Sequence, residues 1–228
     1  MRLKENLDRV RKRISAAALR AGRNPADVKL VAVTKTIPVE IISETLNLGV
    51  FSLGENRVQE FLRKQPVLPQ DLEWHFIGHL QTNKVKKIID KVSLIHSLDR
   101  WPLAVAISQA ACKAGVTARA LIQVNVAGEA AKYGLSPAEA EDFAQAAVAL
   151  PGLELCGLMT IAPLCDDPDE VRYVFRQAAE LARQIKDNIQ GINMDILSMG
   201  MTGDFEVALE EGANLVRIGT ALFGTRNY

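Results

Sequence analysis

The sequence alternates between short aliphatic runs and longer segments with helical periodicity, and this alternation is the feature that most limits the possible folds. Eight runs are rich in β-branched and aliphatic residues and end at glycine or polar residues, as buried strands do. They cover residues 29–34, 50–54, 73–78, 92–96, 118–125, 153–159, 195–198 and 215–218. A helical segment lies between each pair. Strands and helices in strict alternation predict an α/β fold with a parallel sheet.

The number of strand–helix units favours a closed barrel over an open sheet. Eight units at a mean spacing of about 27 residues are typical of a (β/α)8, or TIM-type, barrel. The chain has 228 residues, near the lower end of the roughly 200 to 400 residues that such barrels occupy. An open doubly wound sheet is the alternative. No linker rich in proline, glycine or serine divides the chain, so we expect residues 1–228 to form a single domain.

Several of the helical segments carry their own start and stop signals. Residues 136–139 (Ser-Pro-Ala-Glu) form a capping box with proline at the first helical position, and residues 167–170 (Asp-Pro-Asp-Glu) have the same chemistry. Gly49, Gly115 and Gly212 stand where helices should end. Glycine supplies the left-handed conformation that a helix C-terminus prefers, so these residues support the alternation.

Residues 1–23 predict an extra N-terminal helix before the first strand. Eight of these residues are basic, which is also a property of targeting segments and of some RNA-binding arms. Acidic residues intervene, however, and apolar residues recur at helical spacing, namely Leu3, Leu7, Val10, Ile14 and Ala18. We therefore favour a helix that lays an apolar stripe on the domain and exposes a solvated basic face.

The charge balance and the cysteines exclude several classes of protein. Lys plus Arg and Asp plus Glu both number 27, so the net charge is zero, which is untypical of a nucleic-acid-binding protein. The three cysteines form neither an even set nor a Cys-x-x-Cys pair, which argues against a disulfide framework and a metal site. No apolar run is long enough to span a membrane. We expect a reduced, cytoplasmic protein without a membrane or nucleic-acid partner.

In a parallel barrel, chemistry takes place where strands end, and Lys35 stands at such a position. It follows the aliphatic run at residues 31–34, so its amine should emerge at the mouth of the barrel near the low-dielectric interior. A partly desolvated lysine with a lowered pKa can form a Schiff base with a carbonyl compound. The alternative is a solvent-facing lysine that only ends a strand, and position alone favours that alternative.

The loops after the seventh and eighth strands have the composition of an anion-binding corner. Residues 197–203 (Leu-Ser-Met-Gly-Met-Thr-Gly) and 217–220 (Arg-Ile-Gly-Thr) bring small residues, hydroxyls and free backbone N–H groups to helix starts. Barrels commonly bind phosphate at this corner. Each loop alone could be a tight turn, with Thr202 capping a helix. Together with Lys35 they suggest a phosphorylated aldehyde as ligand, and pyridoxal 5'-phosphate (PLP) satisfies both requirements.

The three histidines and one asparagine are further candidates. His75 and His96 lie in strand patterns without metal-ligand spacing, so we assign them a core or surface role and predict no metal site. His79 begins a loop at the predicted active face and is a candidate ligand contact. Asn56 could donate a hydrogen bond to a bound ring or cap the following helix.

The sequence resembles the PLP homeostasis family, the YggS-like proteins related to the barrel domain of alanine racemase. The matching segments span nearly the whole chain. They are Ala32-Val-Thr-Lys-Thr36, Gly54-Glu-Asn-Arg57, Trp74-His-Phe-Ile-Gly-His-Leu-Gln81, Lys132-Tyr-Gly134, Gly157-Leu-Met-Thr160, Leu197-Ser-Met-Gly-Met201 and Val216-Arg-Ile-Gly219. Thr202 stands where a serine is common in the family and keeps the hydroxyl.

The resemblance implies a set of cofactor contacts. Lys35 would carry PLP as a Schiff base, and Ser198, Gly219 and Thr220 would hold the phosphate. Met199 would add its backbone N–H to the phosphate site. Arg217 would face the pyridine nitrogen, where a permanent positive charge disfavours protonation of the ring and weakens it as an electron sink.

The resemblance also implies a carrier of PLP, with no established catalytic turnover and no catalytic residues. The partners would be PLP and recipient apoenzymes, and we expect a monomer. In alanine racemase a second domain supplies a tyrosine, whereas this sequence stops at Tyr228, so we expect no such domain. A weak PLP-dependent amino-acid racemase that uses Lys35 as its base is the second hypothesis. An aldolase that binds a sugar phosphate on the same lysine is the third.

Overall fold

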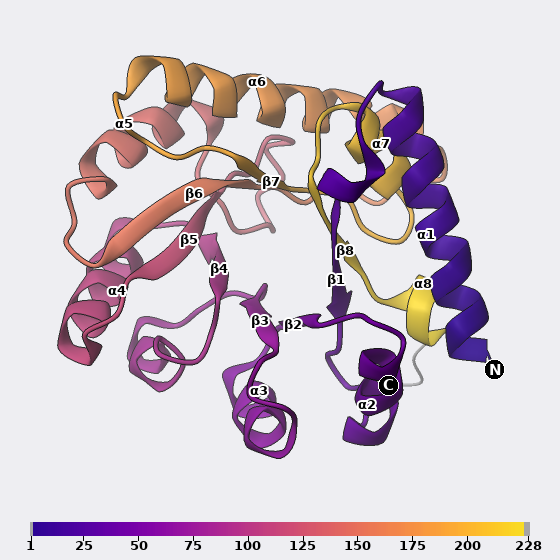
Figure 1. Cartoon of the computed structure of the whole chain (residues 1–228). Helices are drawn as coiled ribbons and strands as arrows, with labels where there is room; N and C mark the ends of the chain where they lie inside the picture. The colour runs from indigo at the N-terminus through magenta and orange to yellow at the C-terminus, as the bar shows by residue number, and fades with distance from the viewer. Residues whose placement is uncertain (1, 226–228) are drawn as a thin grey trace.

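The chain folds as a closed barrel of eight parallel strands surrounded by helices. The computed structural model describes residues 2–225, and Tyr228 lies outside that part. The strands are hydrogen-bonded in the order β1 to β8, and β8 returns to β1 (Figure 1). The predicted (β/α)8 TIM-type barrel with an extra N-terminal helix is confirmed, and the open doubly wound sheet is wrong.

The strands are short, and the predicted ranges lie within two residues of most of their ends. They are β1 Lys29–Val33, β2 Ser52–Glu55, β3 Glu73–Phe76, β4 Leu94–Leu98, β5 Ala118–Gln123, β6 Leu153–Met159, β7 Ile196–Ser198 and β8 Leu215–Ile218. The predicted second and fourth strands start two residues too early. Val50 is buried although it precedes β2, so its hydrophobicity reflects packing of the connection and does not mark the strand end.

The helices form the outer layer. The α-helices are α1 Arg2–Arg20, α2 Val39–Asn47, α3 Val58–Lys64, α4 Trp101–Ala114, α5 Pro137–Ala147, α6 Arg172–Asn188, α7 Phe205–Glu210 and α8 Thr220–Phe223. The 3₁₀ helices are η1 Pro25–Asp27, η2 Gln65–Val67, η3 Thr82–Lys87 and η4 Pro168–Val171. Between β3 and β4 the connection is thus the 3₁₀ helix η3 and not an α-helix. No helix within residues 2–225 combines the length and apolar character that crossing a bilayer requires.

The expected capping signals are present in the structure. Ser136 and Glu139 form the reciprocal capping box at the start of α5. Asp167 accepts a hydrogen bond from the backbone N–H of Asp169, although this turn begins the 3₁₀ helix η4 before α6. Gly115 ends α4 in the left-handed region, with φ of 68°. These local signals therefore located helix ends correctly from sequence alone.

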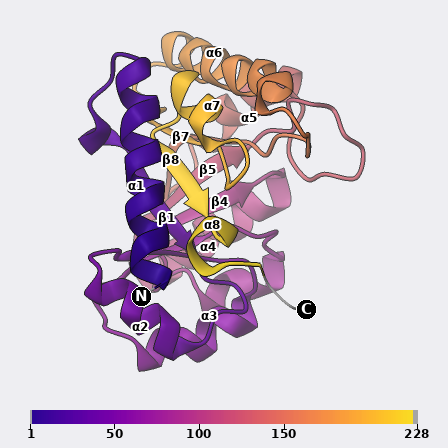
Figure 2. The same ribbon diagram turned by 90° about the vertical axis from the view of Figure 1, so that its right-hand side faces the viewer.

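Helix α1 packs along α7 and α8 on the side of the barrel where β8 meets β1 (Figures 1 and 2). Leu7, Val10 and Ile14 are buried on its inner face. Basic residues of α1 and of the segment after it also contact the outer helices of the barrel. Arg13 forms an ion pair with Glu206, and the guanidinium of Arg23, just beyond the helix, donates hydrogen bonds to backbone carbonyls near α7. The amphipathic helix is confirmed, and part of its basic face is engaged by the barrel's own outer layer.

Two apolar layers fill the molecule. The larger lies between the strands and the helices and includes Phe61, Phe76, Phe175 and Phe205. The smaller consists of side chains from the strands alone, Val31, Leu94, Leu121, Cys156, Met159 and Leu215. All three cysteines are free, and burial raises the pKa of the Cys156 thiol to about 11. This buried thiol is therefore protonated at neutral pH and packs as a small apolar group.

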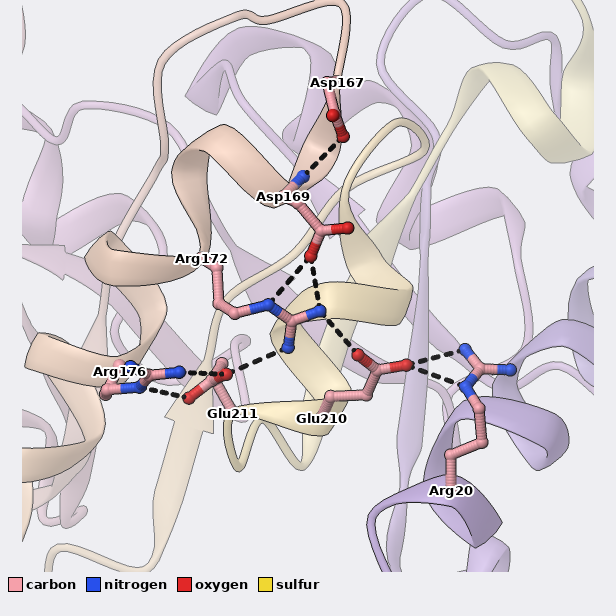
Figure 3. A network of polar contacts seen from close by, with 7 residues as sticks. All are labelled: Arg20, Asp167, Asp169, Arg172, Arg176, Glu210 and Glu211. Carbon is pink, nitrogen blue, oxygen red and sulfur yellow. Dashed lines mark hydrogen bonds and ion pairs between the residues drawn. The ribbon is translucent and has the colours of Figure 1, made fainter.

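An ion-pair network fastens α7 to α6 and α1 (Figure 3). Arg172 at the start of α6 contacts three carboxylates, those of Asp169, Glu210 and Glu211. Arg20 of α1 pairs with Glu210. Hydrogen bonds from these arginines outweigh burial and hold the pKa of Glu210 below its usual value. Because α7 follows the loop after β7, this network fixes the outer side of the predicted phosphate corner.

We predict that Arg172→Ala lowers the free energy of unfolding at pH 7 by about 1–2 kcal/mol, since three ion pairs of roughly 0.2–1 kcal/mol each are lost. The depressed pKa of Glu210 means that this stabilisation is present above pH 4.5 and is lost as the pH falls further. Urea unfolding at pH 7 and pH 3 measures both effects. Arg183→Ala, an exposed position on the same helix, is the control and should change stability by less than about 0.5 kcal/mol. Equal losses in both variants would contradict the network's role.

Candidate functional site

A cavity of about 440 Å³ opens at the carboxyl ends of β1, β7 and β8. Four residues that the sequence analysis placed at the cofactor, Lys35, Arg217, Gly219 and Thr220, line it. Its volume lies within the range of about 300–1,000 Å³ that small-molecule sites occupy. The remaining lining residues are Val33 at the end of β1, Thr225, and residues of the loops after β6 and β7. Those loop residues are Pro163, Leu164, Cys165, Met201, Thr202, Gly203 and Asp204.

Lys35 lies two residues beyond β1 and is half-buried in the cavity wall. Within residues 2–225 its amine makes no hydrogen bond or ion pair, unlike the buried Lys64. The following residue, Thr36, has φ of 63°. A β-branched residue is strained in that left-handed region. The backbone immediately after Lys35 is thus held in an unusual conformation, and the Lys35 amine is available to a ligand.

Arg217 on β8 is almost fully buried and is held by neutral oxygen atoms. Its Nη1 donates to the backbone oxygen of Ser198 at 2.7 Å and to Ser198 Oγ at 2.6 Å. Its Nη2 donates to the carbonyl of Thr160 at 2.9 Å. Burial lowers the pKa of Arg217 to about 10, and only the charge of Asp204 opposes that shift. The guanidinium therefore remains cationic at neutral pH, in a fixed orientation at the edge of the cavity.

The loop after β7 and the start of α8 face each other across the same cavity. Thr202 Oγ1 accepts a hydrogen bond from the backbone N–H of Ala221, at 3.2 Å. The loop reaches this position because Gly200, with φ of 93°, lies so close to Phe205 and Ala208 that an added Cβ would come within 2.8 Å of each. The first N–H groups of a helix have no acceptor within the helix. Together with the Thr202 hydroxyl they form a set of donors suited to an anion.

Two residues expected at the phosphate, Ser198 and Met199, do not line this cavity. Ser198 is completely buried, and its hydroxyl contacts Arg217 and His96 Nδ1. The backbone N–H of Met199 already donates to the carbonyl of Leu215. The physical reason is the alternation of a strand, which turns Ser198 toward the barrel interior. Thr202, which the sequence marked only as a hydroxyl in a small-residue loop, does line the cavity.

Asn56 and His79 do not line the same cavity as Lys35. They border a second cavity, of about 260 Å³, with Arg57 and Lys84. His79 stacks on Tyr133 with ring centroids 3.9 Å apart, and its Nδ1 is 3.4 Å from Asp99 Oδ2. Asn56 Oδ1 is buried without a hydrogen-bond partner within residues 2–225. Both residues do lie at the carboxyl ends of their strands, on the same end of the barrel as Lys35.

His75 and His96 lie in the barrel interior, which confirms their assignment to the core. His75 Nδ1 and His96 Nε2 are 2.8 Å apart, and His96 Nδ1 is 2.9 Å from Ser198 Oγ. Burial lowers the pKa of both imidazoles. Because Arg217 can only donate, the Ser198 hydroxyl accepts a hydrogen bond from it and donates one to His96 Nδ1. In the neutral rings, His96 Nε2 then donates to His75 Nδ1. This chain of hydrogen bonds, called the relay below, runs from Arg217 through Ser198 and His96 to His75, whose Nε2 is 3.6 Å from Glu73 Oε1.

Comparison with known proteins identifies the family. Residues 5–227 match the family model described as the alanine racemase N-terminal domain. The pyridoxal phosphate homeostasis protein of Aquifex aeolicus is 49% identical over 225 residues, which cover 98% of each chain. The chain belongs to the pyridoxal phosphate homeostasis protein family. The Escherichia coli member is 40% identical over 233 residues and matches 98% of this chain and 96% of its own.

Solved structures of family members have the same barrel. PipY of Synechococcus elongatus with PLP bound superimposes with a TM-score of 0.85 at 34% identity, covering 97% of this chain and 100% of PipY. Alanine racemase of Clostridium difficile superimposes with a TM-score of 0.74 at 16% identity. It matches 100% of this chain but only 57% of the racemase, so that likeness concerns the fold of the barrel domain.

We predict that Ser198→Ala destabilises the ligand-free protein by about 1–3 kcal/mol, because it leaves the buried Arg217 and His96 without one of their partners. Denaturant unfolding without ligand measures this effect. Ser43→Ala, at an exposed position of α2, is the control and should change stability by less than about 0.5 kcal/mol. A serine that served only as a phosphate ligand would leave the ligand-free stability unchanged, and that result would contradict the interior relay.

Proposed function

We propose that this protein binds PLP as a Schiff base on Lys35 and serves PLP homeostasis by holding and releasing the cofactor, without turning over a substrate. The observation that carries the proposal is the set of residues that line one cavity. It combines an unpaired lysine amine, a buried cationic arginine and the donors at Thr202, Gly219 and Thr220. A phosphorylated aromatic aldehyde needs these three kinds of group. The relatives named for pyridoxal phosphate homeostasis, and PipY with PLP bound, support the same ligand class.

The residues present fit PLP in chemistry and in position. Lys35 extends from the end of β1, and the anion donors lie beside the end of β8, which is the neighbouring strand. Thr202 and the backbone N–H groups of Gly219 and Thr220 would bind the phosphate. We leave Ser198 and Met199 out of the phosphate site, since their polar groups are already bonded within the fold. Asn56 and His79 remain candidates for the rim of the site only.

Arg217 decides which chemistry the site favours. PLP, when bound, supplies an electron-withdrawing ring that is most effective with a protonated nitrogen. Arg217 would face that nitrogen with a charge that persists to about pH 10. A fixed cation opposes a second positive charge beside it. The ring would therefore be a weak electron sink, which suits storage of the cofactor better than transamination.

The remaining parts of the proposal concern the setting of the site. Residues 1–228 would act as one PLP-binding barrel domain in the cytoplasm, as a monomer whose partners are PLP and recipient apoenzymes. Weak racemase activity based on Lys35 is the alternative, and a chiral assay of alanine with wild-type protein and Lys35→Ala tests it. Inversion of alanine by the wild type but not by Lys35→Ala would show that the protein is a racemase and would overturn the carrier hypothesis.

We predict that the purified protein incubated with PLP and reduced with borohydride gains the mass of one pyridoxyl phosphate group on Lys35. Lys35→Ala should gain no such mass and should lack the visible absorption of the bound cofactor. Lys113→Ala, at an exposed position of α4, is the matched control and should label like the wild type. Intact mass and peptide mapping measure the adduct. Labelling that persists in Lys35→Ala would contradict the assignment, and a sugar-phosphate adduct in place of pyridoxyl would favour an aldolase.

We predict that Thr202→Val weakens PLP binding about 10- to 100-fold, since a hydrogen bond to a charged group contributes roughly 1.5–3 kcal/mol. Binding of pyridoxal, which has the same ring and aldehyde without the phosphate, should change less than twofold. Spectroscopic titration of both compounds measures the difference. An equal loss for the two compounds would place Thr202 outside the phosphate site.

A further inference from the structure

A buried cluster around Lys64 holds the backbone on both sides of Lys35. Lys64 is the last residue of α3, and its side chain is only 8% exposed. Its ammonium donates three hydrogen bonds of 2.7 Å, to the Thr34 carbonyl, to Glu55 Oε1 and to Glu60 Oε1. An ammonium has three donors. All of them are therefore engaged, and one holds the peptide group that precedes Lys35.

Glu60 holds the peptide group that follows Lys35. Its Oε1 accepts a hydrogen bond from the backbone N–H of Thr36, the strained residue with φ of 63°. Burial alone would raise the pKa of Glu60, but the hydrogen bonds from Lys64 and Thr36 outweigh it and hold that pKa below its usual value. The carboxylate is therefore ionised at neutral pH. Among the non-glycine residues in the described part of the chain, Thr36 alone has a positive φ.

The packing of helix α3 on the barrel fixes the positions of Glu60 and Lys64. Glu60 and Lys64 lie one helical turn apart, so both reach the same side of the helix. Between them Phe61 is fully buried and packs edge-on against Trp74 of β3, with ring centroids 5.3 Å apart. Glu55 at the end of β2 completes the cluster and also accepts a hydrogen bond from the Thr34 hydroxyl. Two strands and one helix therefore fix the short segment that carries Lys35.

Stability alone does not account for this cluster. A buried ion pair contributes little more than well-packed apolar residues of the same size. Here Glu55 Oε2 is even buried without a partner within residues 2–225. The charged groups do what apolar groups cannot. Each hydrogen bond from Lys64 or to Glu60 fixes the orientation of a backbone peptide plane beside Lys35. Backbone strain that persists beside a reactive group is characteristic of functional sites.

We propose that Lys64 and Glu60 are positioning residues that hold the strained backbone at Thr36 and so aim the Lys35 amine at the carbonyl carbon of its ligand. The proposal rests on the function proposed for Lys35. Neither residue lines the cavity. In that capture the Lys35 nitrogen forms a C=N bond with the carbonyl carbon, and the carbonyl oxygen leaves as water together with the two amine protons. Removing either residue should therefore slow the capture of an aldehyde by Lys35 and leave the binding of ring and phosphate unchanged.

The test compares a ligand that Lys35 can capture with one that it cannot. Pyridoxine 5'-phosphate has the ring and phosphate of PLP but no aldehyde. Lys64→Met removes all three donors at similar side-chain length, and Glu60→Ala removes the contact with Thr36 and keeps the Lys64–Glu55 pair. For both variants we expect the rate constant of PLP capture, followed by absorbance and borohydride trapping, to fall about 10- to 100-fold. Affinity for pyridoxine 5'-phosphate should stay within twofold of the wild type.

Two further variants separate positioning from a general loss of structure. Glu60→Gln keeps an oxygen acceptor for Thr36 and should restore capture to within about threefold of the wild type. Arg63→Met, at the exposed position beside Lys64, is the matched control and should capture PLP at the wild-type rate. Unfolding curves report whether each variant is folded. Should Lys64→Met fail to fold, Glu60→Ala decides the matter.

The outcomes distinguish this proposal from the function on which it rests. A wild-type protein that captures no PLP on Lys35 would overturn the proposed function, and the positioning role with it. A wild-type protein that captures PLP, with folded Glu60→Ala capturing it equally fast, would overturn the positioning role alone. A parallel loss of affinity for pyridoxine 5'-phosphate would also overturn it, since the cluster would then shape the whole cavity.

Discussion

Strand β1 lies parallel to β8, with Lys29 paired with Leu215 and Ala32 with Ile218, and this pairing closes the barrel. It also creates the site. The segment after β1 carries Lys35, while β8 and its following turn carry Arg217, Gly219 and Thr220. Residues from the two ends of the chain therefore meet because their strands are neighbours. In an open sheet, with β1 and β8 unpaired, the amine and the anion donors would not share a cavity.

The same closure explains why the interior of the barrel can be polar. A relay of His75, His96 and Ser198 reaches Arg217, and each link is a hydrogen bond between buried groups. Buried polar groups are costly unless they are paired. The relay pairs them in series and leaves the arginine oriented and cationic at the cavity. Around Lys35 the cluster of Lys64, Glu55 and Glu60 does the same for the backbone. Arg217 and the backbone beside Lys35 thus depend on separate hydrogen-bond networks.

Much of the fold was predictable because its signals are local. Aliphatic runs mark buried strands, the Ser136 capping box marks the start of α5, and Gly115 marks the end of α4. The predicted start of β2, at Val50, is two residues too early, since connections that pack on the core are as apolar as the strands. Lys35, Arg217, Gly219 and Thr220 could be predicted to lie together because a parallel barrel brings its strand ends to one face, and the four residues line one cavity. The contacts of Lys64 and Glu60 with the backbone around Lys35 were not predictable, since nothing in a helical sequence shows which distant backbone groups a side chain will contact.

The sequence by itself determined the order of strands and helices, the lysine after the first strand and the small-residue loops after the last two. These properties follow from periodicity and from residues that tolerate particular backbone angles, and both are local. Only the tertiary structure decided that Ser198 faces inward to Arg217 while Thr202 faces the cavity. The direction of a side chain at a strand end depends on the register and twist of the closed sheet. That register is set by the pairing of all eight strands, so residues far from the site determine which hydroxyl faces the cavity.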